Sequence, residues 1–132
     1  MAQYEFTVAD VDYTGETASA KDQWQAYHIV CNSKMIIGVQ ERDNLAEKSL
    51  SVIVMSLGWD DLQKLEKLLV KGKITRDEDG IEVAQNLFRD DMPSYSVLIA
   101  RACQENFNEG FSKLSGGKSN AVAGQQKTAN ES

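Results

Sequence analysis

Apolar and polar residues alternate at the start of the chain, and this period of two predicts a β-hairpin. The alternation covers residues 4–8 and 11–13, with Ala9-Asp10 between the two runs. Successive side chains of a strand point to opposite faces, so each run presents one aromatic-rich face. We expect Gly15 to close the hairpin. A lone hairpin is marginal in water, so its aromatic face should pack on helices or on another subunit.

A first helix is predicted from Ser19 to about Ile37 by apolar residues at spacings of three and four. Ser19 is expected to be the N-cap, and Asp22 lies in the first turn, where its charge suits the helix dipole. Gly38 is expected to end the helix. The apolar stripe of this helix comprises Trp24, Tyr27, His28, Cys31 and Met35.

Two further helices are predicted in the middle of the chain. The second covers about residues 44–57 and stops at Gly58, with its apolar face at Leu45, Leu50, Ile53, Val54 and Leu57. The third has Asp60 as its N-cap, with Gln63 three residues later, and it ends at Gly72. Its inner face comprises Leu62, Leu65, Leu68 and Leu69, and its solvent face Lys64, Lys67 and Lys71.

A second short hairpin is expected over residues 74–83, with a turn at Asp79-Gly80. The alternative is a third helix that continues through Gly72. The last helix should start near Asp91 or Met92, with the single proline, Pro93, in its first turn. Its buried side is expected to comprise Tyr95, Leu98, Ile99, Ala102, Cys103, Phe107 and Phe111.

These elements predict a mostly α fold of the α+β class. About four helices form one compact domain over residues 1–114, which also includes the N-terminal hairpin and the second short hairpin. Residues 115–132 are mostly Ser, Gly, Asn, Gln, Ala and Lys, with Val122 as the one large apolar side chain. Such a segment buries too little apolar surface to offset its conformational entropy, so we expect a disordered polar tail.

The charge and the apolar runs of the chain argue against nucleic acids and membranes as partners. The net charge of −6 argues against general affinity for nucleic acid or anionic membranes. The longest apolar run, residues 52–55, is too short to span a bilayer, and the N-terminus has no signal-peptide pattern. We therefore expect a cytoplasmic protein. Cys31 and Cys103 are expected to be buried free thiols, or a disulfide if the helices bring them together.

No catalytic, cofactor or metal-binding residues are predicted. The one histidine, His28, and two distant cysteines do not form a zinc pattern. The segment Gly117-Lys118-Ser119 resembles the end of a phosphate-binding loop, but Ser112 stands where the first glycine should be. Residues 77–80 resemble part of a calcium loop, but the flanking ligand positions carry the wrong residues. A non-enzymatic protein is expected, and a small enzyme or nucleotide-binding regulator is a remaining alternative.

The pattern resembles the tail assembly chaperones of long-tailed bacteriophages, over residues 1 to about 114. The resemblance rests on the aromatic hairpin at residues 4–13, the helix opening at residues 21–26, and the polar hairpin near Asp79-Gly80. The resemblance ends with residues 102–107 and Phe111. Similar proteins have a pair of aromatic residues at this point, and here Gly110 replaces one of the two.

The resemblance implies a chaperone that binds the tape-measure protein, a long helical chain, and keeps it soluble until tail tube subunits polymerise around it. Tail tube protein is a second implied partner, a homo-oligomer would cover the aromatic hairpin, and the location is the cytoplasm of the infected bacterial host. Such chaperones are absent from the mature virion. The alternative is a small structural virion protein of the head–tail junction or tail tip, which would be retained in purified particles.

A holdase for a helical client needs an exposed apolar patch or groove. The client-binding candidates on the first and last helices are Trp24, Tyr27, His28, Met35, Phe107 and Phe111. The competing interpretation is that all six are core residues, because helical apolar stripes usually face the core. Trp24 and Phe111 are the expected exceptions.

Overall fold

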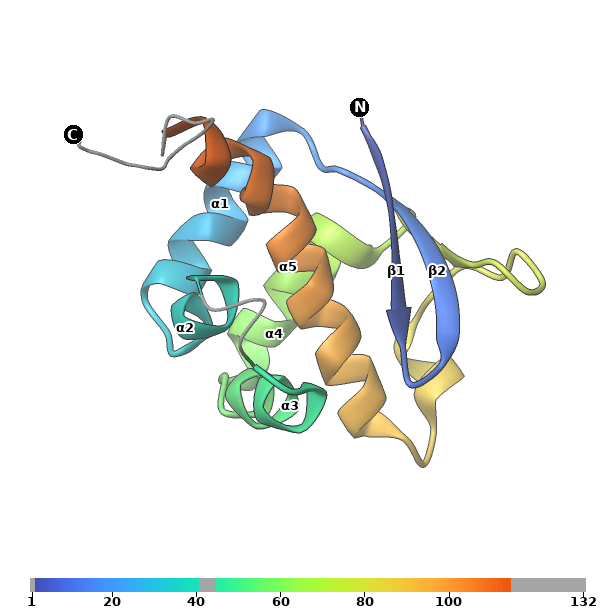
Figure 1. Cartoon of the computed structure of the whole chain (residues 1–132). Coiled ribbons are helices and arrows are strands. Elements are labelled where there is room, and N and C mark those ends of the chain that lie inside the picture. Colours follow the sequence, from blue (N-terminus) through green and yellow to red (C-terminus); the bar gives the residue numbers. More distant parts are fainter. Residues whose placement is uncertain (1, 41–44, 115–132) are drawn as a thin grey trace.

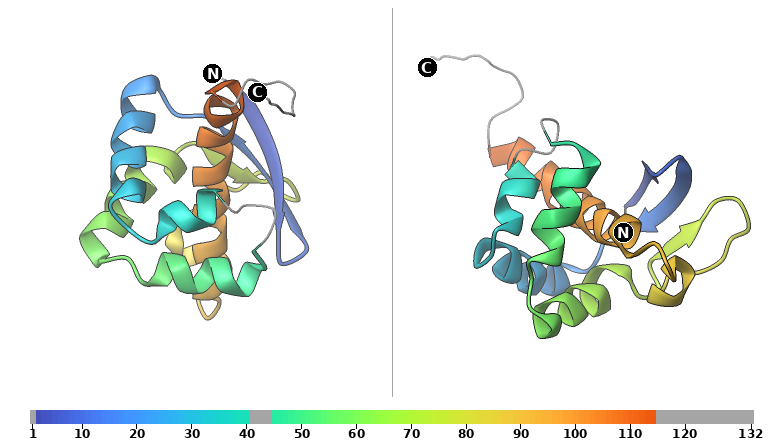
Figure 2. Two further views of the ribbon diagram at one scale, coloured as in Figure 1. Left: turned by 60° about the vertical axis from the view of Figure 1, so that its left-hand side comes forward. Right: turned by 90° about the horizontal axis from the view of Figure 1, so that it is seen from below.

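One long helix, α5 (Met92–Leu114), lies between a layer of helices and a small sheet (Figure 1). The computed structural model describes residues 2–40 and 45–114, and within them the side chains of all but residues 38, 40 and 108–114. The right-hand view of Figure 2, seen from below, shows α5 in the middle, with the other helices on one side and the strands on the other. This arrangement confirms the predicted mostly helical α+β domain.

The N-terminal hairpin is confirmed. Strands β1 (Gln3–Val8) and β2 (Val11–Glu16) are antiparallel. Ala9 and Asp10 form the turn with φ angles of 49° and 66°, the left-handed conformation that two-residue hairpin turns need. Gly15 does not close the hairpin. It lies within β2, opposite Tyr4 on β1.

The second hairpin is only partly formed. Strand β3 (Ile74–Arg76) pairs with β2, which gives a three-stranded antiparallel sheet of order β1-β2-β3. After the turn, where Gly80 has a φ of 71°, Glu82 forms an isolated bridge to Thr75. No regular strand follows because Val83 and Phe88 turn into the core. Phe88 is the last residue of an unpredicted 3₁₀-helix, η2 (Gln85–Phe88).

The first predicted helix is two helices. Its N-cap is confirmed, since the backbone N–H of Asp22 donates to Ser19 Oγ at 3.2 Å. Helix α1 (Ala20–Cys31) then ends six residues before Ile37, because the side-chain amide of Asn32 donates to the carbonyl oxygen of His28 at 2.9 Å. A second short helix, α2 (Met35–Gln40), follows and includes Gly38. The prediction that Gly38 ends the first helix is therefore wrong.

The two central helices lie close to their predicted positions. Helix α3 spans Glu47–Met55, and α4 spans Trp59–Leu65. The N-cap of α4 is Gly58 rather than Asp60, so the helix starts earlier than predicted and places Asp60 and Asp61 in its first turn.

Helix α4 continues into a five-residue π-helix, η1 (Glu66–Val70). The N–H of Lys71 donates to the carbonyl oxygen of Glu66 at 2.8 Å, five residues back. The Glu66 carboxylate accepts hydrogen bonds from the Tyr95 hydroxyl and from Gln85 Nε2, the latter at 2.8 Å. Gly72, with a φ of 73°, ends this segment as predicted.

Helix α5 starts at Met92 as predicted, and its inner face forms the centre of the core. The predicted residues of that face are confirmed as buried at Tyr95, Leu98, Ile99, Ala102, Cys103 and Phe107. The side chain of Phe111 and the predicted tail, 115–132, lie outside the described residues. Cys103 is buried, whereas the prediction for Cys31 is wrong because this thiol is exposed. None of the described helices combines the length and apolar character needed to cross a membrane.

Candidate binding surfaces

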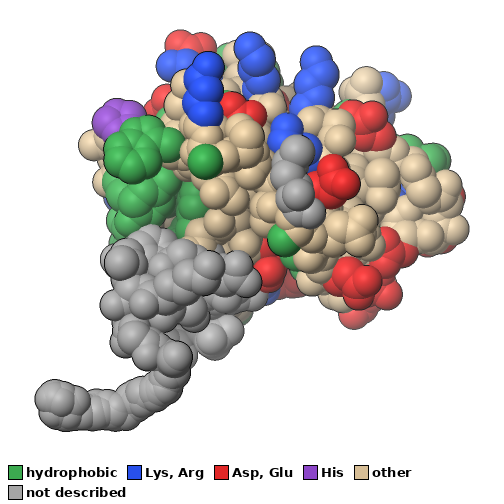
Figure 3. Space-filling view, turned by 90° about the horizontal axis from the view of Figure 1, so that it is seen from above, with side chains coloured by type: hydrophobic (Ala, Val, Ile, Leu, Met, Phe, Trp, Pro, Cys, Tyr) green, Lys and Arg blue, Asp and Glu red, His purple; other side chains and the backbone are tan. Residues whose placement is uncertain are grey.

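The outer face of α1 is one exposed apolar surface. Trp24 is 78% exposed, and His28 and Cys31 follow it at four and seven residues on the same face of the helix. We call these three residues the α1 face. Figure 3 shows hydrophobic side chains gathered beside the single histidine on this part of the molecule.

The predicted client-binding set is not one surface. Met35 and Phe107 are core residues, 2% and 7% exposed, so the prediction that they are accessible to a partner is wrong. Tyr27 is half-buried and packs edge-on against Phe107, with ring centroids 5.2 Å apart. The reason is the rotation of α1, which turns Ala26 and Val30 toward the core. Of the six candidates, Trp24 and His28 are the ones with described, exposed side chains.

A second apolar surface lies at the other end of α5. A cavity of about 220 Å³ opens between the end of α3, the start of α4 and the start of α5. We call it the α3–α5 groove. Its lining is apolar except for one serine and one tyrosine hydroxyl, and comprises Val54, Met55, Leu57, Trp59, Leu62, Met92, Tyr95, Ser96 and Ile99.

The mouth of the α3–α5 groove is formed by large exposed side chains. Met55, Trp59 and Met92 are 59%, 57% and 40% exposed. Val52, 65% exposed, lies one turn before Met55 on α3 and extends the apolar surface along that helix. Methionine side chains adapt to many shapes, which is a property of surfaces that accept varied apolar partners.

The floor of the α3–α5 groove is buried core. Val54, Tyr95 and Ile99 are buried there. The one serine of the floor, Ser96, is also satisfied, because its Oγ lies 2.8 Å from Ser51 Oγ and 2.5 Å from the carbonyl oxygen of Pro93. A partner that enters the groove therefore meets apolar side chains, and the hydroxyls of Tyr95 and Ser96 in the lining already have hydrogen-bond partners.

Sequence reasoning missed this groove, although two signals for it exist in the chain. Trp59 directly follows Gly58, the residue that separates two helices, so it stands at the very end of the apolar stripe that continues with Leu62 and Leu65. Met92 directly precedes Pro93 at the start of α5. Large apolar residues at helix termini contribute little to a helical pattern, yet here α4 and α5 start next to each other and bring them together.

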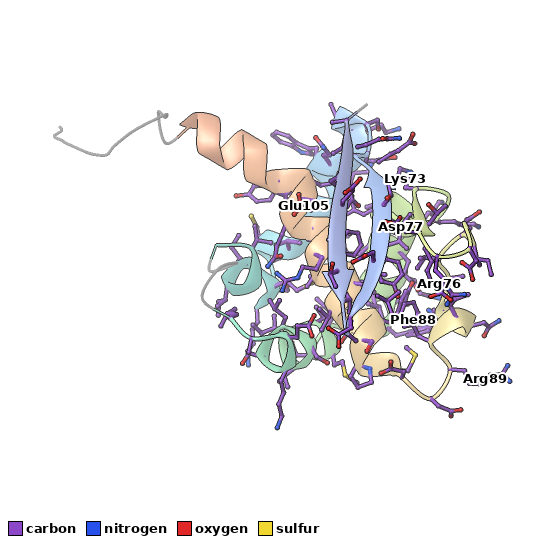
Figure 4. All side chains as sticks on the ribbon, turned by 45° about the vertical axis from the view of Figure 1, so that its right-hand side comes forward. Lys73, Arg76, Asp77, Phe88, Arg89 and Glu105 are labelled. Atoms are coloured by element: carbon purple, nitrogen blue, oxygen red, sulfur yellow. The ribbon has the colours of Figure 1, made fainter. Side chains whose placement is uncertain are left out.

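The edge of the sheet at β3 is charged. Figure 4 shows Lys73, Arg76 and Asp77 along this edge, with Arg89 beyond η2. Much of this charge is paired within the molecule: Arg76 forms an ion pair with Asp79 at 2.5 Å, and Asp77 accepts a hydrogen bond from the Thr14 hydroxyl at 2.7 Å. Within the described part of the chain, no group of three or more His, Cys, Asp or Glu residues could hold a metal ion.

Two buried ionisable side chains, Cys103 and Tyr95, are neutral parts of the core. Complete burial raises the pKa of the Cys103 thiol from 9.0 to about 12, so the thiol is protonated at neutral pH and is a poor nucleophile. Burial, and then its hydrogen bond to Glu66, raise the pKa of the Tyr95 hydroxyl far above its usual value. Both groups therefore act as neutral core side chains.

No protein-family model matches the chain, and no curated protein or solved structure is significantly similar to it.

Proposed function

We propose that this protein is a non-enzymatic tail assembly chaperone of a long-tailed bacteriophage. It binds the tape-measure protein in the cytoplasm of the infected host and keeps it soluble until the tail tube polymerises, and it is absent from the mature virion. The proposal combines the resemblance of residues 1–114 to such chaperones with the apolar surfaces described above.

The observation that carries the proposal is the α3–α5 groove. A holdase for helical clients works by covering the apolar face of a helix, and grooves between helices are a common way to do this. The groove supplies a buried apolar floor and three large, exposed side chains at its mouth, Met55, Trp59 and Met92. Isolated exposed apolar residues are normal on proteins, but a tryptophan and two methionines around one cavity favour a binding site.

The α1 face supplies a second contact for a long client. Phe107, which packs against Tyr27 of α1, lies fifteen residues after Met92 on α5, or about 22 Å along the helix axis. Two apolar surfaces at this separation, about four turns of an α-helix, suit one extended helical chain better than a single small ligand. The net charge of −6 favours solubility of the free chaperone.

The test is co-expression with the tape-measure protein encoded at the same locus. Solubility of the tape-measure protein is scored with this chain, with an empty vector and with an unrelated acidic protein of similar size. The proposal predicts that this chain alone makes the tape-measure protein soluble and copurifies with it. A tape-measure protein that stays insoluble, together with this chain retained in purified virions, would contradict the proposal and favour a structural virion protein.

A further inference from the structure

The charged residues that adjoin the mouth of the α3–α5 groove in the sequence are acidic. Within two positions of the exposed residues at its mouth, Met55, Trp59 and Met92, the charged residues are Asp60, Asp61, Asp90 and Asp91. No lysine or arginine falls within that distance of them. The acidic residues beside the mouth of the cavity thus come from two short segments, 60–61 and 90–91, that are 30 residues apart in the chain.

The helix termini at the mouth do not cancel this charge. Trp59 and Met92 are the first residues of α4 and α5, so the positive ends of both helix dipoles lie there. Each helix terminus is equivalent to roughly half a positive charge, so the two together offset about one of the four carboxylates. Asp60 and Asp61 therefore stabilise α4 and still leave the mouth negative.

We propose that the α3–α5 groove selects an amphipathic helix whose apolar face is flanked by lysines or arginines. This inference rests on the proposed function and names the client segments that the groove takes. The apolar face of the helix covers Trp59 and the two methionines, and one bulky side chain enters the cavity. The basic residues beside that face meet the four carboxylates, which guide the encounter and set the choice of segment.

A helix fits this groove better than an extended strand. The walls are helices, and the exposed residues Val52 and Met55 continue the apolar surface along α3, parallel to one side of the groove. An incoming helix can place residues i, i+3, i+4 and i+7 along such a surface. A strand would leave its backbone N–H and C=O groups unpaired against apolar side chains.

The probes are two synthetic helical peptides of about 18 residues that share one leucine-based apolar face. One peptide has lysines and arginines beside this face, and the other has glutamates at the same positions. The reporter is a full chain with Trp24→Phe, in which Trp59 is the single tryptophan, since the chain contains two. Trp59 fluorescence then reports the groove alone.

The charge variant replaces Asp60, Asp61, Asp90 and Asp91 by Asn. Asn keeps the shape of Asp and tolerates the left-handed backbone at Asp90, where φ is 68°. The control variant makes the same change of net charge away from the groove, at exposed residues of the sheet and its turns: Glu5→Gln, Asp10→Asn, Glu16→Gln and Glu78→Gln. Circular dichroism checks that both variants keep the helical fold.

We expect the basic peptide to bind on the order of tenfold more tightly than the acidic one at low salt, and most of this preference to vanish near 0.5 M salt. The groove variant should lose the preference, and the control variant should keep it. Equal binding of the two peptides, or a preference unchanged in the groove variant, would overturn the inference. A concentration-dependent dimer that dissociates on Trp59→Gln would also overturn it, because a second copy would then cover the groove.

The failure of this inference is distinguishable from failure of the proposed function. A tape-measure protein that copurifies with the chain, while neither peptide changes Trp59 fluorescence, leaves the chaperone function standing and removes the groove as its site. Selective binding of the basic peptide, without any effect on the tape-measure protein, supports the groove and removes the proposed client.

Discussion

The ring of Tyr4 covers the Cα of Gly15 across the hairpin. The two residues are directly paired in the β1–β2 register. A Cβ atom built on Gly15 would lie 2.5 Å from Cζ of Tyr4, so the glycine provides the space that the buried ring occupies. The Tyr4 ring also stacks on Phe6, and Phe6 on Tyr13, so an aromatic row crosses from β1, the strand that packs on α5, to β2.

We predict that Gly15→Ala destabilises the protein by about 1–3 kcal/mol, because the added methyl group forces the Tyr4 ring out of its packed position. The matched control is Gly58→Ser, where nothing lies within 4 Å of the added Cβ and serine is a good N-cap for α4. This control should change stability by no more than about 0.5 kcal/mol. Urea unfolding followed by circular dichroism measures both, and equal stability of the two variants would argue against the Tyr4–Gly15 contact.

The two cysteines should differ sharply in reactivity. Cys31 is exposed at the end of α1, whereas Cys103 is completely buried on α5. A thiol reagent such as DTNB should therefore label one thiol per folded chain quickly and the second one only on unfolding. The Cys31→Ser variant should show no fast phase. Two fast phases in the native protein would mean that α5 is not packed as described.

Stability should fall at alkaline pH, and Cys103 should account for part of this fall. The folded-state pKa of the thiol is about 12, against 9.0 when it is unperturbed. Above pH 9 the unfolded chain releases this proton while the folded chain retains it. The stability contribution is thus complete below pH 9 and is lost toward pH 12, by at most about 1.4 kcal/mol per pH unit.

The Cys103→Ala variant isolates this effect. Its unfolding free energy should be lower at neutral pH because of the cavity, but it should fall less steeply between pH 9 and 11 than that of the native protein. Tyr95, whose pKa is raised by burial and by Glu66, titrates in both proteins and cancels in the difference, whereas Tyr4, whose pKa is raised by burial and then by the charge of Cys103, forms part of the Cys103 effect. Parallel curves for the two proteins would contradict the assigned burial of the thiol.

The hydrogen bond between the Tyr95 hydroxyl and the Glu66 carboxylate should stabilise the folded protein. The Tyr95 hydroxyl donates to the Glu66 carboxylate and connects α5 to the π-helical segment η1. Tyr95→Phe removes a hydrogen bond to a charged group and should cost about 1–3 kcal/mol. Tyr13→Phe is the control, since no hydrogen bond of that hydroxyl is found in the described part of the chain. A thermal-unfolding comparison in which both variants behave alike would show that the Tyr95–Glu66 bond contributes little.

Local patterns predicted the helices and the first hairpin because those elements depend on neighbours in the chain. The turn at Ala9-Asp10, the cap at Ser19 and the start of α5 before Pro93 all follow from short-range chemistry. The pairing of β3 with β2 could not be predicted, since it joins residues about 60 positions apart. No local pattern carries that information.

The candidate site was predictable only in part, because α1 has apolar residues on more than one face. Trp24 and His28 form one stripe, and Ala26 and Val30 form another. The smaller residues face the core, since α1 lies close to η1 and α5, and the larger tryptophan is left outside. Residue size and periodicity alone do not determine which stripe is buried.

The α3–α5 groove is tested most directly as the client site by copurification of the tape-measure protein with two matched variants, Trp59→Glu and Trp24→Glu. Both tryptophans are exposed, so neither change should unfold the domain, and glutamate in the first turn of α4 suits the helix dipole. We expect Trp59→Glu to lower the recovered tape-measure protein by about tenfold or more, and Trp24→Glu to have a smaller effect. Full recovery with a folded Trp59→Glu variant would contradict the assignment of the α3–α5 groove as the client site.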